Sequence, residues 1–202
     1  MRTPDGQRMA SKYATLPLGS ALRIAPAFVA TAVASDIGVE TTIHASYSSE
    51  AGRYRITGTA HRAAEGTEEI SPTVLRQVRL GELLSAAVPY CVVVDYEDAL
   101  LKDVQKRGTV QELLADGGRI VPAKLASIAA KAGPTADTLE LVQLIYGVSA
   151  LAAQPPMRAV ASALGIPERT ATHWITKARK AGLLEGITYA VGRQPDGQTS
   201  VK

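Results

Sequence analysis

Two amphipathic stretches joined by a short break, near the C-terminus, constrain the fold of this chain more than any other feature. Pro155-Pro156 opens the region, Gly165-Ile166-Pro167 interrupts it, and Gly182 ends it. Apolar residues recur at helical spacing on both sides of the interruption. They are Met157, Val160, Ala161 and Leu164 before it, and Ala171, Trp174, Ile175 and Ala178 after it. The pattern predicts two short helices whose apolar faces pack on each other.

The residues around the break suit a close helix crossing and a sharp turn. Ala161 and Ala171 are small enough for two backbones to approach, and Gly165 tolerates a positive φ. Pro167 has a fixed φ and no N–H, so it suits the start of a helix and would break the middle of one. The sequence therefore predicts a turn at 165–167 with a new helix directly after it.

This spacing resembles the helix-turn-helix superfamily of DNA-binding proteins. That family has a small residue, a glycine four positions later, and apolar residues six and nine positions after the glycine. The residues that match this motif core are Ala161, Gly165, Ala171 and Trp174. The segment RAVA–LG–P–RTA–W–ARK–GLL also resembles a group of actinobacterial and actinophage proteins with a β-rich N-terminal part. The resemblance covers the last third of the chain and implies no particular reaction.

The resemblance implies that the second helix lies in the major groove of DNA. The base-contacting residues would be Glu168, Arg169, Thr172, His173 and Thr176. Among these, Arg169 can pair bidentately with guanine. The residues expected at phosphates are Arg158, Thr170, Lys177, Arg179 and Lys180. Phosphate contacts fix the register of a protein on DNA without reading its sequence.

Positive charge is concentrated in this part of the chain. Residues 154–193 include six basic and two acidic side chains, a net charge of +4, so the rest of the chain carries −1 of the total of +3. A solvated basic helix face is the alternative interpretation, since isolated basic residues on helices are common. The coincidence of the turn, the small-residue spacing and the segregated charge favours DNA binding.

Residues 20–95 are predicted to form an α+β unit around a β-hairpin. Apolar and polar residues alternate through 39–48 and again through 54–61, with a turn at 49–52, which is typical of paired strands. Two short helices are expected to follow, from Ser71-Pro72 and over 80–88, and to cover the apolar face of the hairpin. The type of the segment 22–33 stays open because of Pro26. Residues 92–94 are either a further strand or a connector.

The hairpin register has a consequence for its histidines. If Tyr47 lies opposite Tyr54, both apolar faces coincide. His44 then faces Thr57, and His61 faces Glu40. The histidines would be too far apart to chelate one metal ion, so surface histidines without a metal are expected.

The remaining segments complete an α+β fold. Residues 1–19 show no periodicity and are expected to form a flexible arm. Residues 96–133 are expected to be a helical connector, with a capping box at 109–112. Residues 134–202 would be the helix-turn-helix domain, capped by Thr135 or Asp137 and able to fold without the front part. A short wing is possible at 187–191, with a turn at 195–197.

Several classes of protein are disfavoured by the sequence. No apolar run approaches the roughly 18–20 residues of a membrane helix, and the N-terminus lacks a signal peptide, so a cytoplasmic protein is expected. Cys91 lies in an apolar run that suits a buried thiol better than a nucleophile. No nucleotide-binding loop or zinc-binding spacing occurs. Asp95, Glu97 and Asp98 could hold Mg²⁺ in a nuclease, but a solvated helix start fits them better. We expect neither an enzyme nor a cofactor.

The leading hypothesis is a sequence-specific regulator of transcription that binds double-stranded DNA as a homodimer. The front part would supply the dimer contacts or recruit a protein partner, because its hairpin offers more apolar surface than two short helices cover. The residues of that face are Val39, Ile43, Tyr47, Tyr54 and Ile56. The alternatives are a phage or mobile-element adaptor for DNA packaging or recombination, and a protein-binding scaffold that does not bind DNA.

Overall fold

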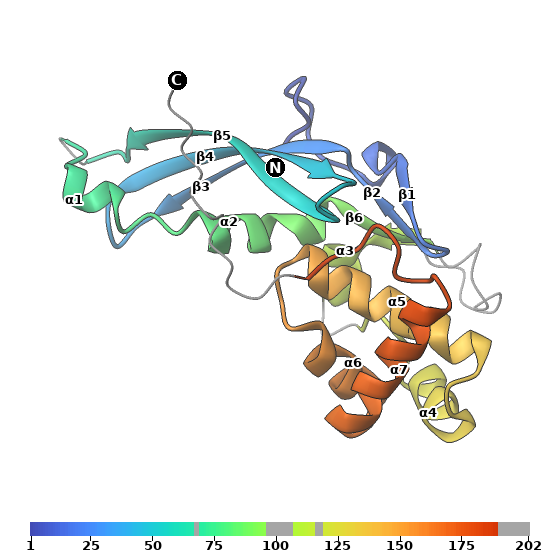
Figure 1. The fold of residues 1–202 in the computed structure, drawn as a ribbon. Coiled ribbons are helices and arrows are strands. Elements are labelled where there is room, and N and C mark those ends of the chain that lie inside the picture. The colour runs from blue at the N-terminus through green and yellow to red at the C-terminus, as the bar shows by residue number, and fades with distance from the viewer. Residues whose placement is uncertain (67–68, 96–106, 116–118, 190–202) are drawn as a thin grey trace, which may run out of the picture.

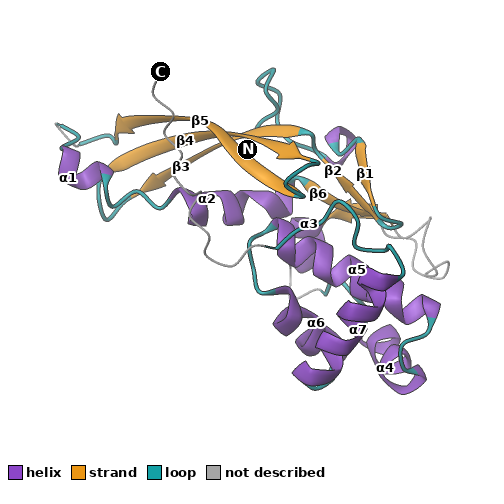
Figure 2. Ribbon diagram, in the orientation of Figure 1, coloured by secondary structure: helices purple, strands orange, loops and turns teal. Residues whose placement is uncertain are grey.

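The computed structural model describes residues 1–66, 69–95, 107–115 and 119–189. Most strands come first in the chain and form two antiparallel sheets, whereas the longer helices come last and gather beside one end of the sheets (Figures 1 and 2). Antiparallel sheets with helices segregated to one side define an α+β fold. The predicted fold class is confirmed at this level.

The larger strands form a three-stranded sheet in the order β3 (Ala27–Ala34), β4 (Val39–Ser48) and β5 (Arg53–Ala63). Tyr47 pairs with Tyr54, as predicted. A register shift between His44 and Ala45 then leaves one additional residue in β5, so His44 pairs with Gly58, and His61 with Thr41. The predicted partners of both histidines were wrong because a β-bulge slips every later pair by one residue.

A second sheet has the strand order β1 (Leu16–Leu18), β2 (Leu22–Ile24), β6 (Val92–Asp95) and β7 (Arg107–Thr109). Residues 92–94 are therefore a strand, although in a different sheet from the hairpin. The prediction of a wholly helical connector over 96–133 was wrong, because β7 lies within that range. Three-residue strands are too short to show a periodicity, which explains why the sequence did not reveal β1, β2 or β7.

Residues 1–19 do not form the loose arm that we expected. They contain the short 3₁₀ helix η1 (Ser11–Tyr13) and strand β1. Arg2 and Val29 also exchange two backbone hydrogen bonds of 2.9 Å, which attach the N-terminus to the edge of β3. Pairing partners far along the chain thus order a segment that has no pattern of its own.

Three helices begin at caps that the sequence suggested. They are α1 (Pro72–Leu75), α2 (Leu80–Ala87), η2 (Val88–Tyr90), α3 (Val110–Leu114), α4 (Ala123–Ala132), α5 (Ala136–Leu151), α6 (Pro156–Leu164) and α7 (Glu168–Lys180). Ser71 and Thr135 cap α1 and α5 through their hydroxyls. Thr109 and Glu112 form the predicted capping box of α3. Side-chain caps are local, so the sequence alone specifies them.

The apolar face of the hairpin is covered within the chain. Helix α2 packs on β3 and β4, and Val39 and Ile43 are fully buried. At the other end, Phe28 packs edge-to-face on Tyr54 at 5.1 Å between ring centroids, and the hydroxyl of Tyr47 donates to the carbonyl oxygen of Gly186. Of the face on which we based a dimer contact, Val39, Ile43 and Tyr54 are therefore buried, and Tyr47 and Ile56 are partly buried.

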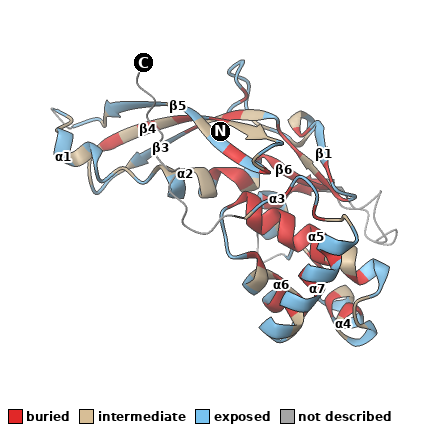
Figure 3. Cartoon of the chain, viewed as in Figure 1, coloured by how far each residue is buried: buried red, intermediate tan, exposed pale blue. Residues whose placement is uncertain are grey.

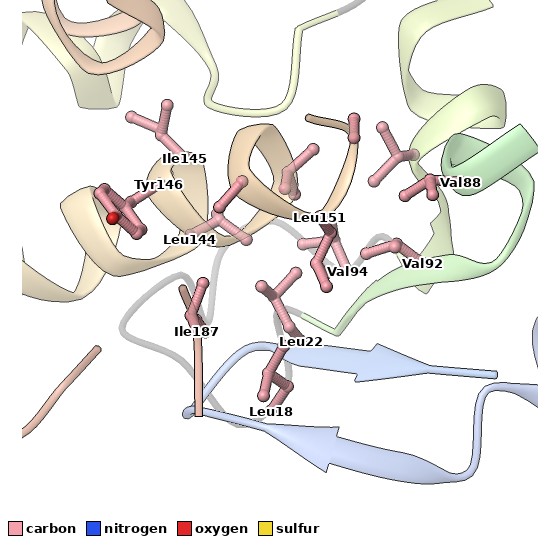
Figure 4. Packing of buried hydrophobic residues seen from close by; sticks show 14 of the residues in the cluster. Leu18, Leu22, Val88, Val92, Val94, Leu144, Ile145, Tyr146, Leu151 and Ile187 are labelled. Carbon is pink, nitrogen blue, oxygen red and sulfur yellow. The ribbon is translucent and has the colours of Figure 1, made fainter. Parts of the chain in front are cut away.

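Helix α5 lies at the centre of one continuous hydrophobic core. The buried apolar cluster extends from Leu18 through α5 to Ile187, and Figure 3 shows buried residues along both the sheets and α5. In Figure 4, Leu22 of β2 lies beside Leu144 of α5, and Ile187 lies close to both. Gly133, with a φ of 77°, separates α4 from α5, but it does not separate two cores.

The described start of the predicted wing, 187–189, forms no strand. Its Thr188 N–H instead donates to the carbonyl oxygen of Gly52 at 3.1 Å. This contact docks the segment after α7 on the β4–β5 turn. The predicted turn at 195–197 lies outside the described residues.

Candidate nucleic-acid interface

The predicted break between two helices lies at 165–167, between α6 and α7. Gly165 ends α6 in the left-handed region, with φ 65° and ψ 36°. The Ile166 N–H donates to the carbonyl oxygen of Ala161 at 3.0 Å, which satisfies a carbonyl at the helix end. Pro167 immediately precedes α7, with a φ of −59°. Glycine supplies the left-handed turn, and proline is compatible with the start of the second helix.

The residues that matched the motif core lie inside the helix pair. Ala161, Ala171 and Trp174 are 8%, 0% and 4% exposed, and Gly165 forms the turn. Helices α5, α6 and α7 all pack against one another. The small alanine side chains allow the close approach of α6 and α7, and Trp174 is buried in the core that these helices share with α5. Two helices, α5 and α6, therefore support the face that α7 presents to solvent.

All five predicted base-contacting residues are exposed on α7. At 3.6 residues per turn, Arg169, His173, Thr176 and Lys180 lie nearly in line along the middle of the solvent face, opposite the buried residues. Glu168 and Thr172 lie on the side next to α6. The solvent face of α7 thus combines hydrogen-bonding side chains with one arginine in its first turn.

The two threonines of this face use their hydroxyl protons within the helix. Thr172 donates to the carbonyl oxygen of Glu168, and Thr176 donates to that of Thr172, both at 2.9 Å. Their oxygens can still accept hydrogen bonds, and their methyl groups can make apolar contacts. In this rotamer Thr172 can therefore contact a base as a hydrogen-bond acceptor or through its methyl group, but not as a donor.

An ion pair joins a predicted base contact to a predicted phosphate contact. Arg158 Nε of α6 lies 3.7 Å from Glu168 Oε1 of α7, and both side chains are well exposed. Such exposed pairs contribute at most about 1 kcal/mol. A phosphate could therefore compete for Arg158 at low cost.

A buried tyrosine orients another of the basic residues. Arg179 Nη2 donates to the hydroxyl oxygen of Tyr146 at 3.1 Å, and its guanidinium carbon lies 5.9 Å from the centre of that ring. Tyr146, on α5, is only 6% exposed. The sequence gave no signal of this contact, because the two residues lie on different helices.

Basic side chains flank α7 on both sides. Arg158 and Arg179 line one groove beside α7, together with Met157, Ile175 and Tyr189. On the opposite flank, helical spacing places Lys177 next to the half-buried Thr170. Lys180 continues the solvent face at the C-terminal end of α7. The arrangement offers hydrogen-bonding groups in the middle and positive charge at both edges.

The sequence also singled out residues outside α6 and α7. Cys91 is buried, and burial raises the pKa of its thiol to about 12. His44 and His61 are exposed, and no cluster of metal-binding side chains occurs among the described residues. Glu97 and Asp98 lie outside the described residues, as does the side chain of Asp95.

No helix in the described ranges is long and apolar enough to cross a membrane.

The chain matches no protein-family model, no curated protein and no solved structure. The functional argument therefore depends on the geometry of α6 and α7 and on the side chains that they expose.

Proposed function

We propose that residues 155–184 form a helix-turn-helix and that the protein is a sequence-specific DNA-binding regulator of transcription in the cytoplasm. The observation that carries the proposal is the solvent face of α7, with Arg169, His173 and Thr176 in the middle and basic residues on both flanks. A helix of this width fits the major groove of B-DNA, whose two edges are lined by phosphates.

Each part of the face has a distinct role in this proposal. Arg169, in the first turn of α7, donates two hydrogen bonds to a guanine edge. The methyl groups of Thr172 and Thr176 contact thymine methyl groups, and His173 hydrogen-bonds a further base. Lys177 contacts the phosphates of one strand, and Arg158 and Arg179 those of the other strand.

The proposed complex contains two copies of the chain. One α7 contacts only a few base pairs, and specific affinity generally comes from two half-sites about one helical turn apart. Most of the hairpin face that we first assigned to the dimer packs within the chain, so the contact between copies uses a different surface. This proposal predicts that the preferred DNA site has two-fold symmetry.

Selection of binding sites from a pool of random duplexes tests the proposed function. The full-length protein should enrich one motif, with two half-sites in inverted orientation. Its affinity should fall steeply with salt, since each phosphate contact releases counterions. If no motif is enriched and the affinity for random DNA is not measurable at low salt, the protein is not a DNA-binding regulator. Enrichment of a single, asymmetric half-site would contradict only the dimer.

A further inference from the structure

A cavity of about 130 Å³ lies between α4 and α5, beside the β1–β2 turn. Helix α4 lines it with Leu125, Ile128 and Ala129, and α5 lines it with Leu141 and Leu144. For comparison, an apolar cavity of about 150 Å³ in another protein holds benzene. The cavity therefore has room for one small ring or one branched alkyl group.

Two carboxylates line this largely apolar cavity. Asp137 and Glu140 both line it, one helical turn apart on α5. The hydroxyls of Thr135 and Thr138, which also line it, hydrogen-bond to each other at 3.0 Å, and Thr135 caps α5. Neither carboxylate forms an ion pair with a residue in the described ranges. The carboxylates thus remain available to a ligand.

The two acids differ in how the fold stabilises their charge. Asp137 lies in the first turn of α5, where the helix dipole favours a negative charge. Glu140 lies one turn further on, beyond most of that effect. Burial raises the pKa of Glu140, and the neighbouring charge of Asp137 raises it further. A cation beside Glu140 would offset both effects.

The mouth of the cavity also exposes apolar surface. Ile128 is 53% exposed, the highest value among the exposed large apolar residues of the described chain. Contact with a ligand that carries an apolar group would cover this side chain. An anionic ligand would be repelled by Asp137 and Glu140, and a neutral apolar ligand would leave Glu140 desolvated without a partner.

We propose that this cavity binds a small organic cation, with a protonated amine at Glu140 and an apolar ring or branched chain against Leu125, Ile128 and Leu144. Asp137 contributes a second negative charge at the same end of the ligand. This site is separate from the solvent face of α7, and its occupancy can be measured without DNA.

Benzylamine is a suitable probe, with benzyl alcohol and benzoate as its neutral and anionic counterparts. Ligand binding to the full-length protein is followed by two-dimensional NMR titration. We expect benzylamine to shift resonances of α4 and α5 with saturation, and the other two compounds to bind at least tenfold more weakly. Equal binding of benzyl alcohol and benzylamine, or no saturable binding of benzylamine, would overturn the proposal.

Three variants locate the site. Glu140→Gln keeps the size of the side chain and should weaken benzylamine at least tenfold, while Glu50→Gln, on the exposed β4–β5 turn, should leave its affinity unchanged. Ala132→Leu adds volume at an exposed position lining the cavity and should prevent binding. If Glu140→Gln binds benzylamine as tightly as the unchanged protein, Glu140 does not hold the amine and the assignment is wrong.

Discussion

Gln143 of α5 donates a hydrogen bond from Nε2 to the carbonyl oxygen of Leu18 at 3.3 Å. Gln143 is fully buried, and its Oε1 accepts a second hydrogen bond of 3.3 Å from the Ser20 hydroxyl. A buried amide with both ends satisfied fixes its partners in place, since leaving either end unpaired costs free energy. This residue therefore joins the β1–β2 turn to the helix that supports α6 and α7.

Substitution of Gly19 tests this junction. A Cβ at Gly19 would lie 1.4 Å from Gln143 Nε2, and its φ is +69°. Gly19→Ala should therefore combine backbone strain of about 1–2 kcal/mol with displacement of the buried amide, and lower the free energy of unfolding by about 3 kcal/mol or more. Gly6→Ala is the control, because Gly6 also has a positive φ but no atom near its Cβ. Equal losses in urea unfolding of the two variants would contradict the role of the junction.

The fragment 134–202 should not fold cooperatively, contrary to the expectation from the sequence. Its helix α5 packs on the front part through Leu144 and Gly147, and a Cβ at Gly147 would lie 2.6 Å from Leu22 Cδ1. Without the sheet, this apolar face would be exposed to water. Thermal melting followed by circular dichroism should show a broad transition for the fragment and a sharp one for the full chain. A sharp transition for the fragment would restore a domain boundary at Gly133.

Features of the fold that depend on neighbouring residues were predictable, and those that depend on distant partners were not. The capping hydroxyls of Ser71 and Thr135 act within one helical turn, so the sequence located the first and reduced the second to a choice between Thr135 and Asp137. The Tyr47–Tyr54 pair followed from alternation on either side of one turn. By contrast, β1 and β7 exist only because other strands pair with them. Helix α5 is apolar on most sides. Its sequence therefore did not reveal which of these sides packs against the front sheet.

The same distinction holds for the candidate interface. Helical periodicity alone identified which residues of α7 face solvent, and the Gly165 turn was predicted correctly. The contacts of those side chains were not predictable, because Arg158 and Glu168 meet across two helices, and Arg179 meets Tyr146 of α5. Contacts between side chains on separate elements depend on packing that the sequence pattern does not specify.

Tyr146→Phe should show how much the orientation of Arg179, as distinct from its charge, contributes to DNA affinity. The variant removes only the hydroxyl that accepts from Arg179, so binding to all duplexes should weaken by about 0.5–1.5 kcal/mol. The salt dependence should stay unchanged, because no charge is lost. Arg179→Ala should reduce the salt slope by about 1. Fluorescence anisotropy at several salt concentrations measures both, and a Tyr146→Phe variant with a reduced slope would contradict the positioning role.

Alkaline pH should destabilise the fold through Cys91. Burial raises its pKa from 9.0 to about 12, so the folded chain retains a proton that the unfolded chain releases. The free energy of unfolding should therefore fall as the pH rises from about 9 towards 12. Burial also raises the pKa of Tyr54, which acts in the same direction. Cys91→Ala should make this fall shallower in urea unfolding measured across that range, and an unchanged slope would show that Cys91 does not contribute.

The most direct test of the proposed function compares Arg169→Ala with Arg76→Ala on two duplexes. Arg76 is exposed at the end of α1, far from α7. Its replacement by alanine therefore removes the same charge without touching the proposed interface. The affinities for the selected site and for a random duplex are measured by anisotropy at one salt concentration. We predict that Arg169→Ala weakens the selected site by about 1–3 kcal/mol more than the random duplex, and that Arg76→Ala changes neither appreciably. Equal losses of Arg169→Ala on both duplexes would contradict base reading by α7.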